Sequence, residues 1–355
     1  MHKGIEYEVV RNTADLECFV PEWSALWSAD PFATPFQSPE WLLPWWHQFG
    51  QQDLCAIVIL QDGSAVGFLP FYVYRDLITE ERQLLLNGAG TTDYLDGVFS
   101  RHCSLEHVSE ALRIACDSKN WDRMIVFQLR RESLLLQALC RCEASGLFDT
   151  ESCSRIRPVG IAGLPKHIRR NVRYYRNCAA RNGELEMVEA DEHNWLQHFE
   201  ELRRLHCECW NARDQAGVLT DQRVLAWHRE AIPKLLRAEL LKLYSLRLNG
   251  EAIAAAYTLL DPPQRRGRTQ YLYLMGYSAR HAELSPGTLL LAQIVAQAAA
   301  QDVQTIDLLR GDEAYKHLWH SEKVPTYGCA RSCNRAGAAV DRAFWENYDF
   351  TLAAP

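Results

Sequence analysis

The hydrophobic pattern of this chain of 355 residues repeats one order of elements twice. Residues 54–74 form two strand-like runs around Asp62-Gly63, and residues 240–260 form two more around Asn249-Gly250. Such turn pairs suit two-residue β-hairpins. In each half a third strand, a loop, a helix, a strand and a further helical segment follow. We therefore expect a mixed α/β fold, with α+β mixed sheets, built from two similar units.

The expected boundary between the units follows residue 155, which gives a first domain of residues 1–155 and a second of 156–355. Helices are predicted over 105–118 and 132–145 in the first half. The second half begins with a basic segment that has no acid before Glu184, and helical patterns follow over 192–209 and 221–238. Helical spacing would place the basic residues on one face. They are Lys166, Arg169, Arg170, Arg173, Arg176 and Arg181.

Composition indicates a globular protein, with 48% hydrophobic and 23% charged residues. A formal net charge of -7 argues against DNA or general nucleic-acid binding. No apolar run approaches the roughly 20 residues that span a bilayer, and no signal-peptide core is present, so we expect a cytoplasmic protein without a membrane span. The 12 cysteines include no CxxC pair. Because Cys207 and Cys209 are only two apart, we expect no metal site there.

One helix start carries a chemical signal. In "ELSPGTLLLAQIVAQAAA", Ser285 suits the N-cap and Pro286 suits the first helical position. Gly287 then lets another molecule approach the backbone closely. The free amides of such a first turn, with the helix dipole behind them, attract anions. An ordinary capped helix is the alternative interpretation.

The surrounding residues make the signal more specific. "YLYLMGYSARHAELSPGTLLLAQIVAQAAAQDVQTIDLLRGDEAYKHLW" resembles the signature of the CelD-like acetyltransferase family. This family belongs to the GNAT superfamily and has a Fem-like, double-GNAT layout. Weaker similarity extends over most of the chain, so the resemblance implies tandem GNAT-like domains. The matching elements are the Tyr-rich strand, Ser285-Pro286-Gly287, Asp307, Gly311, Tyr315-Lys316 and Trp319.

The resemblance implies acyl transfer from acetyl-CoA or another acyl-CoA, without a metal. In GNAT enzymes the strand before the phosphate-binding helix splays from its neighbour to admit pantetheine. Here that strand is residues 271–276, and the backbones of Met275 and Gly276 would bind the pantetheine amides. The pyrophosphate would lie on residues 285–290, whose first members are Ser285, Pro286, Gly287, Thr288 and Leu289. This segment has one glycine where the usual GNAT loop has two.

The expected catalytic groups follow the second splayed strand. Tyr315 occupies the position where GNAT enzymes often place a proton donor for the leaving thiolate. Asp307, Asp312 and Glu313 cluster near the expected acceptor entry, where one could act as general base or orient an amine. Lys316 could pair with one of these acids, and His317 is a reserve base. Packing for Tyr315, and capping or surface roles for the acids, are the alternative interpretations.

The acceptor side is expected to involve the segment "HCECWNARDQAG", which contributes His206, Trp210 and Arg213. Arg213 could clamp an acidic group. The first unit has nothing like Ser-Pro-Gly before its helix, so we expect a degenerate GNAT-like domain that has lost cofactor binding. Asp93 and Asp96 would then help to shape the acceptor cleft.

The leading hypothesis is a CoA-dependent N- or O-acyltransferase acting on a small-molecule or carbohydrate-linked acceptor. The family's association with polysaccharide and cell-envelope building makes an amino sugar plausible. One alternative is a Fem-type transferase that takes an aminoacyl group from tRNA, held by the basic face of 166–181. The net negative charge and the scarcity of aromatic residues beyond Tyr174 and Tyr175 argue against it. The other alternative is a non-catalytic GNAT-like scaffold.

Overall fold

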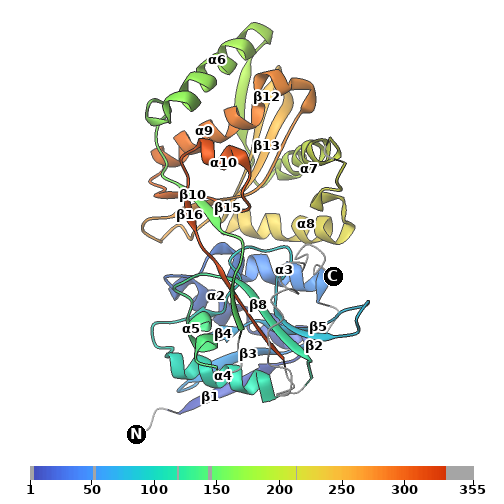
Figure 1. The fold of residues 1–355 in the computed structure, drawn as a ribbon, viewed down its shortest axis with the longest axis vertical. Helices are drawn as coiled ribbons and strands as arrows, with labels where there is room; N and C mark the ends of the chain where they lie inside the picture. The colour runs from blue at the N-terminus through green and yellow to red at the C-terminus, as the bar shows by residue number, and fades with distance from the viewer. Residues whose placement is uncertain (1–3, 51–52, 118–119, 143–145, 213, 333–355) are drawn as a thin grey trace. The chain divides into compact units, whose positions relative to one another are not determined.

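The computed structural model describes residues 4–50, 53–117, 120–142, 146–212 and 214–332. The chain forms two compact units (Figure 1). Unit 1 comprises Met1–Glu151 together with Pro325–Pro355, and unit 2 comprises Ser152–Val324. The expected mixed α/β class is confirmed, since each unit combines helices with mixed β-sheet.

Unit 1 contains two sheets, with strand orders β1-β3-β4-β7 and β2-β5-β6-β8-β17-β9. Its strands are β1 (Ile5–Val10), β2 (Asp53–Leu54), β3 (Ala56–Gln61), β4 (Ser64–Leu69), β5 (Phe71–Arg75), β6 (Arg82–Leu86), β7 (Val98–Phe99), β8 (Arg123–Leu129), β9 (Gly146–Asp149) and β17 (Tyr327–Ser332). Its helices are α1 (Thr13–Cys18), α2 (Val20–Ala29), η1 (Pro35–Gln37), α3 (Pro39–Phe49), α4 (Leu105–Asp117) and α5 (Leu134–Cys140).

Unit 2 contains one sheet, in the order β11-β12-β13-β14-β15-β10-β16. Its strands are β10 (Cys153–Ile156), β11 (Leu185–Glu189), β12 (Leu241–Leu248), β13 (Glu251–Leu260), β14 (Thr269–Tyr277), β15 (Thr305–Arg310) and β16 (Glu322–Val324). Its helices are η2 (Ile161–Gly163), α6 (Lys166–Asn182), α7 (Trp195–Asn211), η3 (Val218–Thr220), α8 (Gln222–Arg237), η4 (Ala279–Leu284), α9 (Pro286–Ala300) and α10 (Ala314–Leu318). Helices α7 and α8 cover one face of this sheet, and α9 with α6 covers the other (Figure 1).

The two units repeat one topology, as the sequence pattern predicts. The pair β6 and β8 in unit 1 corresponds to β14 and β15 in unit 2, and these are the two parallel pairs among the described strands. Both hairpin turns have positive φ angles, at Asp62 (53°) and Gly63 (77°) and at Asn249 (52°) and Gly250 (84°). Positive φ at both central residues is the type I′ geometry expected of these dipeptides.

The division between the units differs from the expected boundary after residue 155. Strand β10 follows β9 directly in the sequence but lies in the sheet of unit 2, between β15 and β16. Strand β17 follows β16 but lies in the sheet of unit 1, between β8 and β9. One interior strand in each unit therefore comes from sequence that adjoins the other unit. Sequence order alone assigns each of these two strands to the wrong unit.

Helix α9 is held rigidly because it is buried on several sides. Leu289, Leu290 and Leu291 are almost fully buried, as are Ile294 and Val295 in the following turn. These side chains join a core formed with α6 and the facing side of strands β12–β15. The packing fixes the direction of the first turn of α9, as expected from its apolar sequence.

On the other face, α7 packs against β14 without a gap at Gly276. A Cβ atom at Gly276 would lie 2.3 Å from the backbone N of His206. Because the obstructing atom belongs to the backbone of a helix, a side-chain rotation cannot relieve the overlap. Glycine is therefore required where α7 crosses the strand.

We predict that Gly276→Ala lowers the free energy of unfolding by about 2 to 3 kcal/mol, because overpacking forces α7 away from β14. Thermal or chemical denaturation monitored by circular dichroism measures the change. Gly160→Ala is the matched control, since a Cβ there meets no atom within 4 Å. Equal stability of the two variants would contradict the close contact.

Candidate functional site

The candidate site begins where β14 and β15 separate. The two strands pair in parallel at only three positions, and the last pair is Tyr271 with Asp307. In the ladder to β13, Tyr257 is opposite Leu274 and Thr258 is opposite Leu272, so Tyr273 is the extra residue of a β-bulge. A bulge bends its strand and often lies beside an active site. The expected splay between these strands is thus present in the structure.

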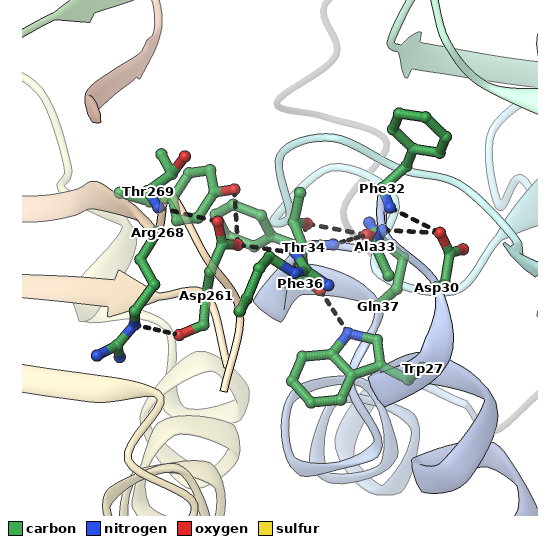
Figure 2. A network of polar contacts seen from close by, with 12 residues as sticks. Trp27, Asp30, Phe32, Ala33, Thr34, Phe36, Gln37, Asp261, Arg268 and Thr269 are labelled. Carbon is green, nitrogen blue, oxygen red and sulfur yellow. Dashed lines mark hydrogen bonds and ion pairs between the residues drawn. The ribbon is translucent and has the colours of Figure 1, made fainter. Parts of the chain in front are cut away.

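The base of the separation is fixed by two buried carboxylates. Figure 2 shows Asp261 accepting the backbone N–H of Thr269, at 2.9 Å. The hydroxyl of Tyr271 also donates to Asp261, at 3.0 Å. On the neighbouring strand, Asp307 accepts from Arg155 Nε at 2.8 Å. Asp261 thus fixes the start of β14 to the end of β13, and Asp307 fixes β15 to β10, while β14 and β15 meet each other only in their three backbone pairs.

The register of β14 decides which backbone groups face the gap. The N–H of Ser278 donates to the carbonyl oxygen of Ile253, on the β13 side. Along an antiparallel ladder, successive residues direct their N–H and C=O groups alternately toward the partner strand and away from it. By this alternation Gly276 directs its N–H and C=O to β13, whereas Met275 directs its groups to the open edge. Of the two residues expected to bind pantetheine amides, only Met275 is oriented to do so.

The outward groups of Tyr277 are already satisfied. Its N–H donates to Cys209 Sγ at 3.2 Å, and the thiol donates back to its carbonyl oxygen at 3.1 Å. Cys209 lies on α7, one turn after His206. The backbone groups of Tyr277, the next ones after Met275 to face the open edge, are therefore not available to a ligand.

The start of α9 has fewer free amides than expected. Ser285 occupies the N-cap, but its φ of 45° and ψ of 57° are left-handed, and its hydroxyl donates to Thr288 Oγ1 instead of accepting an amide. The right-handed helical region is disfavoured for a residue before proline, so Ser285 does not continue η4 into α9 as a regular helical residue. Ser285 N–H donates to Ala282 O, and the amides of Thr288 and Leu289 donate to Ser285 O.

Pro286 has no N–H, so within the described part of the chain the first turn leaves the amide of Gly287 without an acceptor. A Cβ at Gly287 would lie 3.2 Å from the ring of Tyr277 and 3.8 Å from Met275 Cε. The first turn of α9 therefore packs on the Met275 and Tyr277 side chains of β14, the strand whose backbone edge is open at Met275. The absence of a side chain at Gly287 leaves room for the ring of Tyr277, and the expected approach of another molecule to the Gly287 backbone stays a prediction.

His206 and Trp210 lie on the last turns of α7. Trp210 Nε1–H donates to His206 Nε2 at 2.9 Å. Since the indole nitrogen can only donate, a neutral His206 must carry its proton on Nδ1. This Nδ1 is buried and has no partner among the described residues. Gly217 packs directly on both rings, because a Cβ there would lie within 3.0 Å of each.

Burial lowers the pKa of His206 to about 4. The imidazole is therefore neutral at physiological pH and presents a donor instead of a base. Arg213, the third residue expected on the acceptor side, lies outside the described residues.

Two of the expected catalytic residues are occupied by structural bonds. Asp307 is fully buried, and besides Arg155 it accepts the backbone N–H of Leu309 at 2.9 Å. Lys316 is 2% exposed, and its ammonium donates to the carbonyl oxygens of Leu309, Arg310 and Gly311. It also pairs with Glu313 at 2.8 Å. This arrangement stabilises the end of β15, where Leu309 has a positive φ of 58°.

The remaining expected groups are more accessible. Asp312 is exposed and pairs with Lys323 at 2.7 Å and with His317 at 2.9 Å. The hydrogen bond from Lys323 lowers the pKa of Asp312. Tyr315 packs against the α9 core, and burial, followed by the charge of Glu313, raises the pKa of its hydroxyl well above the usual range. Tyr315 therefore stays protonated and can only donate or accept as a phenol.

Asp93 and Asp96 belong to unit 1, and both are buried. Asp96 accepts from Ser133 Oγ and Gly97 N–H, and burial raises its pKa to about 7. In the same unit, Figure 2 shows Asp30 accepting the amides of Phe32 and Ala33. An acceptor role for Asp93 and Asp96 stays a prediction.

Sequence reasoning did not single out Asp261, Arg155 or Cys209 as residues that shape the site. Cys209 carried a usable signal, since it follows His206 at helical spacing and therefore shares its face. Arg155 carried none, because its partner Asp307 is far away in sequence. Among the described residues, no helix is long and apolar enough to cross a membrane. Those residues also include no group of three His, Cys, Asp or Glu side chains placed to hold a metal.

The neutral state of buried His206 predicts an acid-sensitive stability. Between pH 6.5 and about 4 the unfolded chain binds a proton at His206 that the folded chain does not, so the free energy of unfolding falls as the pH is lowered. The contribution is about 3 kcal/mol over this window. Denaturation across pH should show a steeper loss for the natural protein than for His206→Gln. Parallel curves would contradict the assignment.

The segment that contains this site is similar to a known family of protein domains. Residues 166–317 match the family model described as an acetyltransferase (GNAT) domain. None of the curated protein sequences compared with the chain matches it.

The solved structures that resemble the chain extend the likeness to both units. FemX has a TM-score of 0.61 at 10% identity, covering 91% of this chain and 96% of its own. The C-terminal domain of a putative lysylphosphatidylglycerol synthetase from Agrobacterium fabrum has a TM-score of 0.58 at 14% identity, covering 93% and 94%. L-PGS from Bacillus licheniformis has a TM-score of 0.57 at 16% identity, covering 91% and 93%. Residues 166–317 of unit 2 are thus similar to a GNAT acetyltransferase domain, and these solved structures share the fold of the chain along nearly their whole length.

Proposed function

We propose that the protein is a CoA-dependent acyltransferase, which moves an acetyl or other acyl group to an amine or hydroxyl of a small or carbohydrate-linked acceptor. One observation carries the proposal: Gly287, whose amide is free, lies against the side chains of Met275 and Tyr277, and the strand that bears them has an open backbone edge at Met275. A thioester carrier with amides along its arm and a diphosphate at its end complements this pair of features.

The residues present fit such a donor. The N–H and C=O of Met275 can pair with a pantetheine amide as an added strand would. The amide of Gly287 and the positive end of the α9 dipole can hold the diphosphate, with the hydroxyls of Ser285 and Thr288 close by. Pro286 and Leu289 are buried beneath this turn and support it. When bound, the CoA thioester supplies an activated acyl group.

The chain then has three tasks: to orient the acceptor, to exclude water and to supply a proton to the leaving sulfur. Tyr315 suits the last task, because its raised pKa keeps the phenol protonated. His206 suits the first, since its Nδ1–H is a donor held by Trp210. Asp307 and Lys316 act indirectly by fixing the end of β15. Exposed Asp312 and Glu313 can attract a cationic amine.

The finer acceptor class follows from the family resemblance, in which polysaccharide and cell-envelope building recurs. An amino sugar offers the amine or hydroxyl that the transfer requires. We therefore place amino sugars first among acceptors to be tested, ahead of simple amines.

A second candidate is a Fem-type transferase that uses an aminoacyl-tRNA donor. The whole-chain likeness to FemX and to the lysylphosphatidylglycerol synthetase favours it, as does the basic helix α6. The free amide of Gly287 favours the CoA donor, because a diphosphate is absent from an aminoacyl ester. A non-catalytic scaffold is the remaining alternative.

We predict that acetyl-CoA or free CoA raises the melting temperature, because a ligand at 100 times its Kd adds about 2.7 kcal/mol of stability. Gly287→Val should lose this shift, since a branched side chain would occupy the space beside Met275 and Tyr277. Gly160→Ala should keep it. The measurement is a thermal-shift titration of the full chain.

The same titration separates the alternatives. A shift with aminoacyl-tRNA and none with either CoA species would favour the Fem-type reaction. A melting temperature that no donor changes would leave only the scaffold.

We also predict that Tyr315→Phe lowers kcat by about 100-fold and leaves KM for the acyl-CoA nearly unchanged, because the lost hydroxyl acts on the leaving sulfur in the transition state. Release of free CoA in the presence of an amino sugar measures the rate. Tyr175→Phe is the control, since Tyr175 packs against the same core. Equal activity of both variants would reduce Tyr315 to a packing residue.

A further inference from the structure

Helix α6 presents the most concentrated charge in unit 2. Six cationic side chains project from its 17 residues, and the helix contains no acid. All six are exposed, and none forms an ion pair with a described residue. They are Lys166, Arg169, Arg170, Arg173, Arg176 and Arg181.

The cations share one face, opposite the packed one. Ile168, Val172 and Ala179 are buried against α9 and the sheet. At 3.6 residues per turn the six cations fall in an outward arc of roughly 140°, along a row of about 22 Å. In unit 2 as a whole Lys and Arg outnumber Asp and Glu, and without α6 the balance reverses. The positive excess of this unit is therefore carried by one exposed ridge.

The shape of the ridge selects among polyanions. Proteins that bind single-stranded nucleic acid use a groove with several stacking aromatics. Helix α6 is a convex ridge, and Tyr174 is the large hydrophobic residue strongly exposed on it, at 61%. The groove at its C-terminal end is lined by Glu251 and Glu283 as well as by Arg280 and His281, so the cationic row does not continue into a uniformly positive groove.

We infer that α6 docks the protein on an anionic lipid surface. A flat layer of negative headgroups can meet all six cations of a straight ridge at once, and each contributes to adsorption. Tyr174, at the edge of the arc, suits the boundary between headgroups and water. Since the apolar face of α6 is committed to the core, the attachment is electrostatic, reversible and weakened by salt. It does not depend on acyl transfer.

The test is co-sedimentation of the full chain with phosphatidylcholine vesicles that contain or lack phosphatidylglycerol. At low salt we expect binding only to the vesicles with phosphatidylglycerol, and release at high salt. The triple variant Arg170→Gln, Arg173→Gln, Arg176→Gln should lower the partition coefficient by on the order of 100-fold. These positions avoid Arg169, which donates to Ala162 O.

The matched control neutralises three exposed arginines on α8, as Arg223→Gln, Arg229→Gln, Arg237→Gln. It should bind vesicles like the natural protein. Equal loss in both triple variants would overturn the assignment to α6, as would natural protein that ignores phosphatidylglycerol. Binding of an unrelated RNA through α6 without vesicle binding would overturn it in favour of nucleic acid. Should the α6 variant unfold, the lipid and salt dependence of the natural protein decides.

Discussion

The short parallel contact between β14 and β15 is the constraint on which the candidate site depends. The strands meet for three residues and then part, so that beyond Tyr271 no strand among the described residues pairs with this edge of β14. Asp261 anchors the start of β14 to the end of β13, the Asp307–Arg155 pair anchors β15 to β10, and the bulge at Tyr273 bends β14. An edge left open inside a sheet would normally invite pairing with another chain. Here α7 covers one face and Cys209 closes the next rung, so that the opening is confined to a short stretch.

Local patterns predicted the parts of the fold that local chemistry determines. The hairpins at Asp62-Gly63 and Asn249-Gly250 follow from the positive φ angles that these residues tolerate, and the apolar run after Pro286 follows from helical periodicity. The exchange of β10 and β17 could not be predicted in this way. Both strands are short and adjoin the unit they do not join, and pairing between distant strands leaves no mark on adjacent residues.

The site shows the same limit in its residues. The approach of Gly287 to β14 was predictable, because the bare helix start and the strand before it are close in sequence. That the amides of the first turn already bond to the carbonyl oxygens of Ala282 and Ser285 was not predictable, since it depends on the left-handed conformation of the cap at Ser285. Likewise, the acids and the lysine that follow β15 suggested a catalytic role. In the structure, the ammonium of Lys316 instead donates to carbonyl oxygens at the end of that strand.

The exchanged strands also determine how the chain can be divided. Strand β17 lies between β8 and β9 in unit 1, and β10 lies between β15 and β16 in unit 2. In each unit, therefore, one interior strand adjoins residues of the other unit in the sequence. No single break in the backbone releases two intact halves: a fragment ending before Pro325 lacks an inner strand of the first sheet. Synthesis from the ribosome must therefore reach nearly the last described residues before the first unit can close its hydrogen-bond ladder.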